Sequence, residues 1–191
     1  MRSRPGLTPA HQTEKIISDD GLVGLMASVA EGVLMTMDTV DFRQALGKFA
    51  TGVCLVTVND AELGPLSTTV NSFSSVSLDP PLVLWSIQNC SDHLAVYTEC
   101  QHFGISVLSS EQGALSSQYA QRGGHWAQAE HFTAGPQGEP QLIDALAHFT
   151  CAAYAVHPGG DHQIIVGEVV HFGSREADPL IFFSGGYRAL S

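Results

Sequence analysis

Short apolar runs, separated by turn-forming residues, dominate the chain after residue 38. They are rich in β-branched and aromatic residues and are bounded by Gly, Pro or polar clusters, a pattern that predicts β-strands. The predicted strands cover residues 53–58, 66–70, 82–87, 103–108, 148–156, 163–172 and 180–183.

A helix is predicted just before the first of these strands. Asp41 is placed to cap it, and Gly52 marks its end. Its apolar side chains fall at helical spacing, so we expect the helix to lie on the core: Phe42, Ala45, Leu46 and Phe49.

Two shorter helices and one long loop complete the predicted elements. Ser91 or Asp92 caps a helix that ends near residue 100, and a second helix covers residues 110–120. Residues 121–141, rich in Gly and Pro, are predicted as a loop. Because strands outnumber helices and no long helices alternate with them, the pattern favours a small antiparallel barrel over a parallel α/β sheet.

Residues 1–37 lack this pattern and are predicted to be a flexible extension, with one domain covering residues 38–191. The net charge of −11 argues against nucleic acid as a partner, because polyanion binding needs clustered cations. After Met37 the cations are few and scattered: Arg43, Lys48, Arg122, Arg175 and Arg188.

The cysteines and the hydropathy bear on the compartment. Four cysteines without paired spacing are expected to be reduced. No apolar run reaches the roughly 20 residues that a membrane helix needs, and no signal peptide is recognisable. We therefore expect a cytoplasmic protein without a membrane partner.

Motifs for the common catalytic sites are lacking in the sequence. It contains no GxSxG elbow, HExxH helix, Walker loop or GxGxxG turn. The nine histidines have no neighbouring ligands at metal-binding spacing, so no metal site is expected.

One segment stands out, STTVNSFSSVSLDPP at residues 67–81. Its density of hydroxyl side chains fits a polar edge strand that runs into a loop. It fits equally a cradle for a planar, phosphorylated ligand, since hydroxyls and exposed N–H groups bind phosphate and carbonyl groups without net positive charge. Composition alone leaves both interpretations open.

Four ordered motifs resemble one family. FRQALGKFATGV from residue 42, TVNSFSSVSLDPPLVLWSI from residue 69, GGDHQIIVGEV from residue 159 and PLIFFSGGYRAL from residue 179 are similar to the short-chain flavin reductases that serve two-component flavin monooxygenases. The resemblance implies an FMN-binding split β-barrel of Greek-key type. It also implies a homodimer that uses NADH or NADPH to reduce FMN or FAD and delivers the reduced flavin to a partner monooxygenase.

The resemblance also implies site residues. Thr69, Val70 and Asn71 match positions that line the isoalloxazine ring. Positions near the ribityl chain and phosphate are matched by a group of serines: Ser72, Ser74, Ser75 and Ser91.

The nicotinamide position is matched by His162, and Tyr187 with Arg188 would close the same pocket. His162 as a plain hairpin residue and Tyr187 as a packing aromatic are the alternatives. Two positions depart from the usual pattern: Ser67 stands where many relatives have Gly, and Cys90 stands where many are polar or basic.

No acid–base triad is expected, since hydride transfer between stacked rings is chemistry of the cofactors. The scarcity of Arg favours NADH over NADPH, whose 2′-phosphate usually needs one. The competing functions are a non-catalytic flavin carrier or sensor and an oxidase of an amine or pyridoxine-like substrate. The oxidase would need more basic residues than this domain contains.

Overall fold

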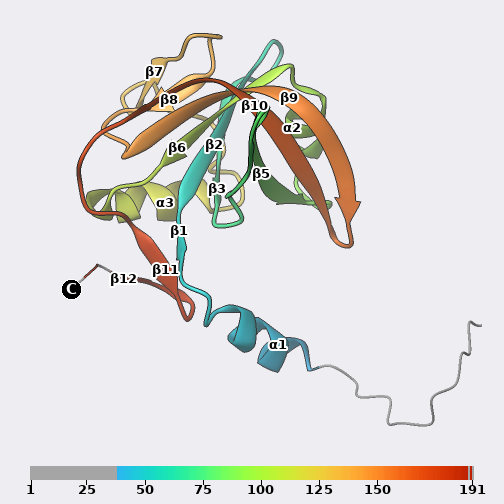
Figure 1. Ribbon diagram of the computed structural model, residues 1–191, viewed down its shortest axis with the longest axis vertical. Coiled ribbons are helices and arrows are strands. Elements are labelled where there is room, and N and C mark those ends of the chain that lie inside the picture. The colour runs from blue at the N-terminus through green and yellow to red at the C-terminus, as the bar shows by residue number, and fades with distance from the viewer. Residues whose placement is uncertain (1–37, 189, 191) are drawn as a thin grey trace, which may run out of the picture. The chain divides into compact units, whose positions relative to one another are not determined.

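A seven-stranded antiparallel sheet forms the body of the protein in the computed structural model, which describes residues 38–188 and 190. All described residues belong to one unit, Met37–Ser191, and the predicted extension lies outside them. The strand order is β3-β2-β6-β9-β10-β5-β4. Figure 1 labels these strands except β4. The strand bounds are β2 Cys54–Asp60, β3 Gly64–Val70, β4 Ser74–Leu78, β5 Pro81–Gln88, β6 His102–Val107, β9 Ala147–Gly159 and β10 His162–Ser174.

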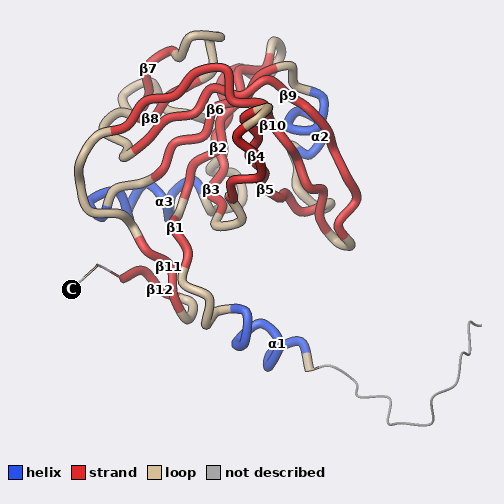
Figure 2. The backbone as a smooth tube through the Cα atoms, viewed as in Figure 1, coloured by secondary structure: helices blue, strands red, loops and turns tan. Residues whose placement is uncertain are grey.

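The sheet curls because two consecutive strands lie at its opposite edges. β3 and β4 are joined only by residues 71–73, so the edges can be at most about 15 Å apart where the chain crosses. Ser72 closes the gap: its hydroxyl accepts the N–H of Ser86 on β5 at 2.9 Å and lies 3.3 Å from the carbonyl of the same residue. The result is the predicted antiparallel barrel, whose strands are drawn in red in Figure 2.

Strand β2 is buried on both faces from Cys54 to Val58, and this stretch is apolar apart from Thr57. One face joins a cluster around Trp85, whose ring meets Tyr97 edge-on at 5.4 Å. Leu55 on the other face joins a second cluster under α3 that includes Tyr119 and Leu180.

Helix α1, Thr39–Leu46, differs from the sequence expectation in three ways. It ends at Leu46 with Gly47 as its C-cap, so Gly52 does not mark its end and Phe49 lies outside it. Asp38, not Asp41, is the N-cap, since its carboxylate accepts the N–H of Val40 at 2.7 Å. The helix has no buried residue, so the expectation that it lies on the core is wrong. Helical spacing identifies an apolar face, but it does not say which element covers that face.

The two later helices are short and begin beyond the predicted caps. α2, Leu94–Glu99, has His93 at its N-cap without a side-chain capping bond, so capping by Ser91 or Asp92 was wrong. The 3₁₀-helix Ser110–Gln112 leads into α3, Gly113–Tyr119. Here Ser109 and Gln112 form a capping box.

The predicted loop 121–141 contains a hairpin, β7 Phe132–Ala134 and β8 Pro140–Leu142. A buried carboxylate holds its turn: Glu139 accepts hydrogen bonds from the Thr150 hydroxyl at 2.5 Å and the Gln137 N–H at 2.9 Å. Gly and Pro content indicated the turns but not this anchor.

A second, three-stranded sheet lies near the end of the chain in the order β1-β11-β12. Its strands are Thr51–Gly52, Ile181–Phe183 and Gly186–Arg188. Among the helices of the described residues, none is long and apolar enough to cross a membrane.

Ser67 allows a test of whether a buried hydroxyl without a hydrogen-bond partner lowers the stability of the core. Its hydroxyl is fully buried in β3 and has no hydrogen-bond partner, so it loses hydration without compensation. We expect Ser67→Ala to raise the free energy of unfolding by about 1 kcal/mol, measured by urea denaturation.

Ser116→Ala is the matched control. Its hydroxyl is equally buried but hydrogen-bonds the Tyr187 hydroxyl at 2.7 Å. This variant should lose about 1 to 2 kcal/mol. Equal destabilisation by both substitutions would contradict the assignment of an unsatisfied hydroxyl at Ser67.

Candidate functional site

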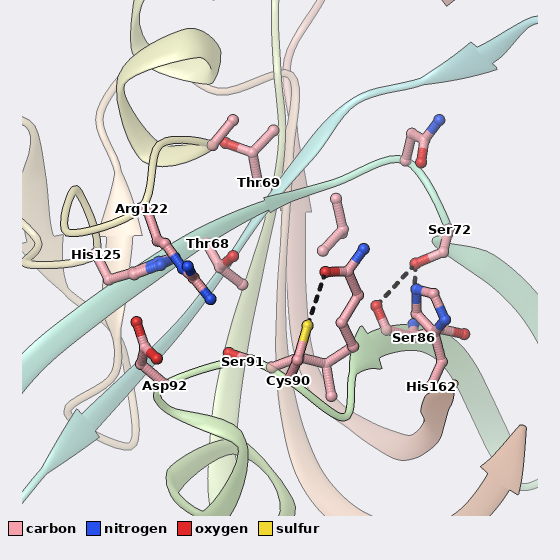
Figure 3. A pocket seen from close by; sticks show the side chains of 15 residues that line it. Thr68, Thr69, Ser72, Ser86, Cys90, Ser91, Asp92, Arg122, His125 and His162 are labelled. Atoms are coloured by element: carbon pink, nitrogen blue, oxygen red, sulfur yellow. Dashed lines mark hydrogen bonds between the residues drawn. The ribbon is translucent and has the colours of Figure 1, made fainter. Parts of the chain in front are cut away.

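A cavity of about 440 Å³ lies where β3, the end of β5, the start of β10 and the loop after α3 meet (Figure 3). This volume lies within the range of small-molecule sites. Most of the residues that line it carry polar side chains, although the lining surface is about half apolar. The lining residues are Thr68, Thr69, Val70, Asn71, Ser72, Ser86, Ile87, Gln88, Cys90, Ser91, Asp92, Ala120, Arg122, His125 and His162.

The Ser-rich segment supplies one wall of this cavity. The hydroxyl of Thr69 donates to the Ser116 carbonyl on α3 at 2.7 Å, so this side chain is already engaged. Thr68 and Asn71 make no side-chain hydrogen bond within the described part of the chain. A ligand can therefore use the Thr68 hydroxyl and the Asn71 amide without breaking an existing bond.

Two cationic or protonatable side chains, Arg122 and His125, reach the cavity from the loop after α3. Figure 3 shows them on the same side of the view, with Asp92 beneath them. The loop is tied to β3, since the Ser67 N–H donates to the His125 carbonyl at 2.6 Å. The His93 ring meets the His125 ring edge-on at 5.2 Å.

His162 enters the cavity from the opposite side of the view, near Ser72 and Ser86 (Figure 3). It follows the β9–β10 turn, where Gly160 adopts φ +74°. Its Nδ1 lies 2.7 Å from the Asp161 carboxylate. That contact holds the pKa of Asp161 below its usual value, through the hydrogen bond first and the charge of the imidazole second.

The ionised carboxylate of Asp161 can only accept, so Nδ1 of His162 must carry a hydrogen. The contact therefore selects the tautomer and leaves Nε2 as the ring nitrogen available to a ligand.

The cavity brings together the predicted residues Thr69, Val70, Asn71, Ser72, Ser91 and His162. Ser74 and Ser75 lie on the edge strand β4 and do not line it. Tyr187 and Arg188 on β12 also lie outside the lining. Tyr187 contacts the wall indirectly, because its hydroxyl bonds Ser116, whose carbonyl holds Thr69.

Arg122 and His125 were missed by the reasoning from sequence. The available signal was that Arg122 is one of few cations after residue 37, but only the folded loop brings it to β3. Among the described residues, no group of three or more His, Cys, Asp or Glu side chains is placed to hold a metal ion.

The two departures from the expected pattern have different surroundings. Ser67 is fully buried and does not line the cavity, whereas Cys90 lines it with an exposed side chain. All four cysteines are free thiols. Burial raises the pKa of both Cys54 and Cys151 to about 12, which makes these two thiols unreactive.

Comparison with known proteins gives consistent matches. Residues 46–191 match the family described as the flavin reductase like domain. An FMN reductase (NADH) of Agrobacterium fabrum is 45% identical over 150 residues, which are 78% of this chain and 85% of the relative. The reductase subunit of a flavin-dependent monooxygenase of Rhodococcus jostii is 34% identical, over 81% of this chain and 79% of its own length.

A solved structure shares the fold. The NADH:FAD oxidoreductase of Streptomyces globisporus, in complex with NAD and FAD fragments, superposes with a TM-score of 0.74 at 32% identity. The match covers 81% of this chain and 93% of that one. The barrel, the cavity at its edge and these matches together show that the chain belongs to the flavin reductase like domain family.

Proposed function

We propose that this chain is an NADH-dependent flavin reductase that transfers a hydride from NADH to FMN or FAD and supplies the reduced flavin to a partner monooxygenase. The observation that carries the proposal is the polar cavity at the barrel edge, in a member of a family whose named relatives are NADH-dependent flavin reductases and monooxygenase reductase subunits. The cytoplasm, where thiols remain reduced, is the compartment we propose.

The residues of the cavity fit a flavin. The segment from Thr68 to Asn71 offers a strand edge, a free hydroxyl and a free amide, which suit the carbonyl and N–H groups of an isoalloxazine. Arg122 offers positive charge for the phosphate at the other end, and His125 and Ser91 offer polar side chains beside it. The predicted roles of Ser72, Ser74 and Ser75 near the ribityl chain remain proposals.

The bound flavin and nicotinamide would supply the hydride chemistry, so the protein would need no nucleophile or acid–base triad. Its own contribution is positioning. The hydrogen bonds from Ser72 to Ser86 and from Thr69 to Ser116 hold the wall of the cavity in place. His162, fixed by Asp161, borders the place proposed for the nicotinamide.

The choice of NADH follows from the charges around the cavity. Arg122 is its only Lys or Arg within the described residues, and the Asp92 carboxylate lines the same end. If Arg122 serves the flavin phosphate, no second guanidinium is left for the 2′-phosphate of NADPH.

Steady-state kinetics test the function directly. We expect NADH oxidation, followed at 340 nm, to proceed through many turnovers and to be stimulated by added free FMN or FAD. The kcat/KM should be higher with NADH than with NADPH. Tight retention of flavin without stimulation by free flavin would overturn the proposal.

The role of His162 is tested by its removal. We expect His162→Ala to raise the KM for NADH roughly tenfold, because it removes a side chain that borders the nicotinamide. His171→Ala, an exposed histidine on the same strand, is the control and should leave the KM unchanged. An unchanged KM in His162→Ala would exclude this role.

We also propose a homodimer in which a second copy covers α1. This helix is only eight residues long and has no buried residue, and an isolated helix of that length is unstable in water. Its apolar side chains are exposed, with Phe42 at 49% and the following Phe49 at 79%. Such a surface marks an interaction site.

Sedimentation equilibrium tests this arrangement. The expected mass is twice that of the 20.3 kDa chain, and Phe42→Ser with Leu46→Ser should shift it toward one chain. A single-chain mass for the unaltered protein at micromolar concentration would rule the dimer out.

A further inference from the structure

The turn that carries His162 is held at the end of the neighbouring strand β5 by Asn89. Strand β10 pairs with β5 as far as His162 and Gln88, and Asn89 is the next residue of β5's chain. The ladder ends there, so the turn at residues 159–161 has no further strand partner on this side.

Asn89 extends the contact between β5 and the β9–β10 turn with three hydrogen bonds. Its backbone N–H donates to the Asp161 carbonyl at 2.9 Å. Its side-chain Nδ2 donates to the Gly160 carbonyl at 3.0 Å, and its Oδ1 accepts from Gln163 Nε2 at 2.9 Å. One asparagine thus contacts three of the residues that surround His162.

These contacts lead to the imidazole. The Asn89 side chain holds the carbonyl of Gly160, which precedes Asp161, and its backbone N–H holds the Asp161 carbonyl. The Asp161 carboxylate in turn holds Nδ1 of His162. The side chains of Asn89 and Asp161 are exposed, so they hold the turn through hydrogen bonds and not through burial. These polar contacts therefore help to set the position of the His162 ring.

We propose that Asn89 is a positioning residue, which sets the His162 ring for the nicotinamide by docking the β9–β10 turn onto the end of β5. This inference rests on the role proposed above for His162. It assigns Asn89 no contact with either cofactor. The β5–β10 ladder sets the register of the two strands, and Asn89 extends their contact beyond the last pair to the turn at Gly160.

A mutant cycle tests the proposal. Asn89→Ala removes two side-chain hydrogen bonds, which together correspond to a roughly tenfold effect on the KM for NADH. His162→Ala should give a similar increase, and the double variant Asn89→Ala/His162→Ala should be no worse than His162→Ala alone. Additive effects would show that Asn89 acts by another route and would overturn the proposal.

Two further variants sharpen the result. Gln163→Ala, which loses only the bond to Asn89 among the described residues, should raise the KM by roughly threefold and leave the KM for flavin unchanged. Asn59→Ala is the matched control: it removes one exposed side-chain bond, to the Gly138 carbonyl at 3.2 Å, far from the cavity lining. It should change neither KM.

Amide hydrogen exchange gives a readout that is independent of activity. In Asn89→Ala the amides of residues 160–163 should exchange faster, while those of the paired part of β10 keep their protection. Unchanged exchange together with an unchanged KM for NADH would refute the docking. If His162→Ala leaves the KM for NADH unchanged, the proposed role of His162 fails. If His162→Ala raises the KM for NADH and Asn89→Ala does not, only the role of Asn89 is overturned.

Discussion

The hydrogen bonds between Ser72 and Ser86 mark the constraint on which the site depends. They close the sheet where three residues carry the chain from one edge strand to the other. If β3 and β4 were joined by a long loop, the sheet could remain flat and its edges would be unrelated. The short connection forces the curl and places the exposed edge of β3 beside the end of β5.

The cavity is built from this closure and needs few specialised side chains. Backbone, hydroxyl and amide groups line the wall formed by β3, and positive charge comes from a single loop that is bonded to the same strand at Ser67. A protein that only has to hold two rings in contact can work this way, because the difficult chemistry belongs to the cofactors. The acidic net charge of the chain is compatible with phosphate binding, because hydrogen-bond donors within the site can bind a phosphate whatever the net charge of the chain.

Strands and barrel class could be predicted from the sequence because apolar runs and turn residues are local signals. The segment at residues 67–81 shows both the strength and the limit of this reasoning. Its first part forms the edge strand β3 and lines the cavity, whereas the interpretation as a cradle for a phosphorylated ligand stays a prediction. The separation of Ser74 and Ser75 from the cavity was not predictable, since it depends on which way the chain turns at residues 71–73.

Features that depend on contacts between residues far apart in the sequence were also not predicted. The exposed face of α1, the anchor that Glu139 gives to the β7–β8 hairpin and the arrival of Arg122 at β3 all follow from tertiary contacts. The motif match found His162 but not Asn89, because the hydrogen bonds of Asn89 join segments that only the β5–β10 pairing brings together.

A crystal structure of this protein with FMN or FAD and NAD bound tests the central claim most directly. The account predicts an isoalloxazine ring against the backbone of Thr69, Val70 and Asn71, a phosphate within hydrogen-bond distance of Arg122 or His125, and a nicotinamide beside His162. A flavin bound outside this cavity, or bound with its phosphate at the His162 end, would contradict it.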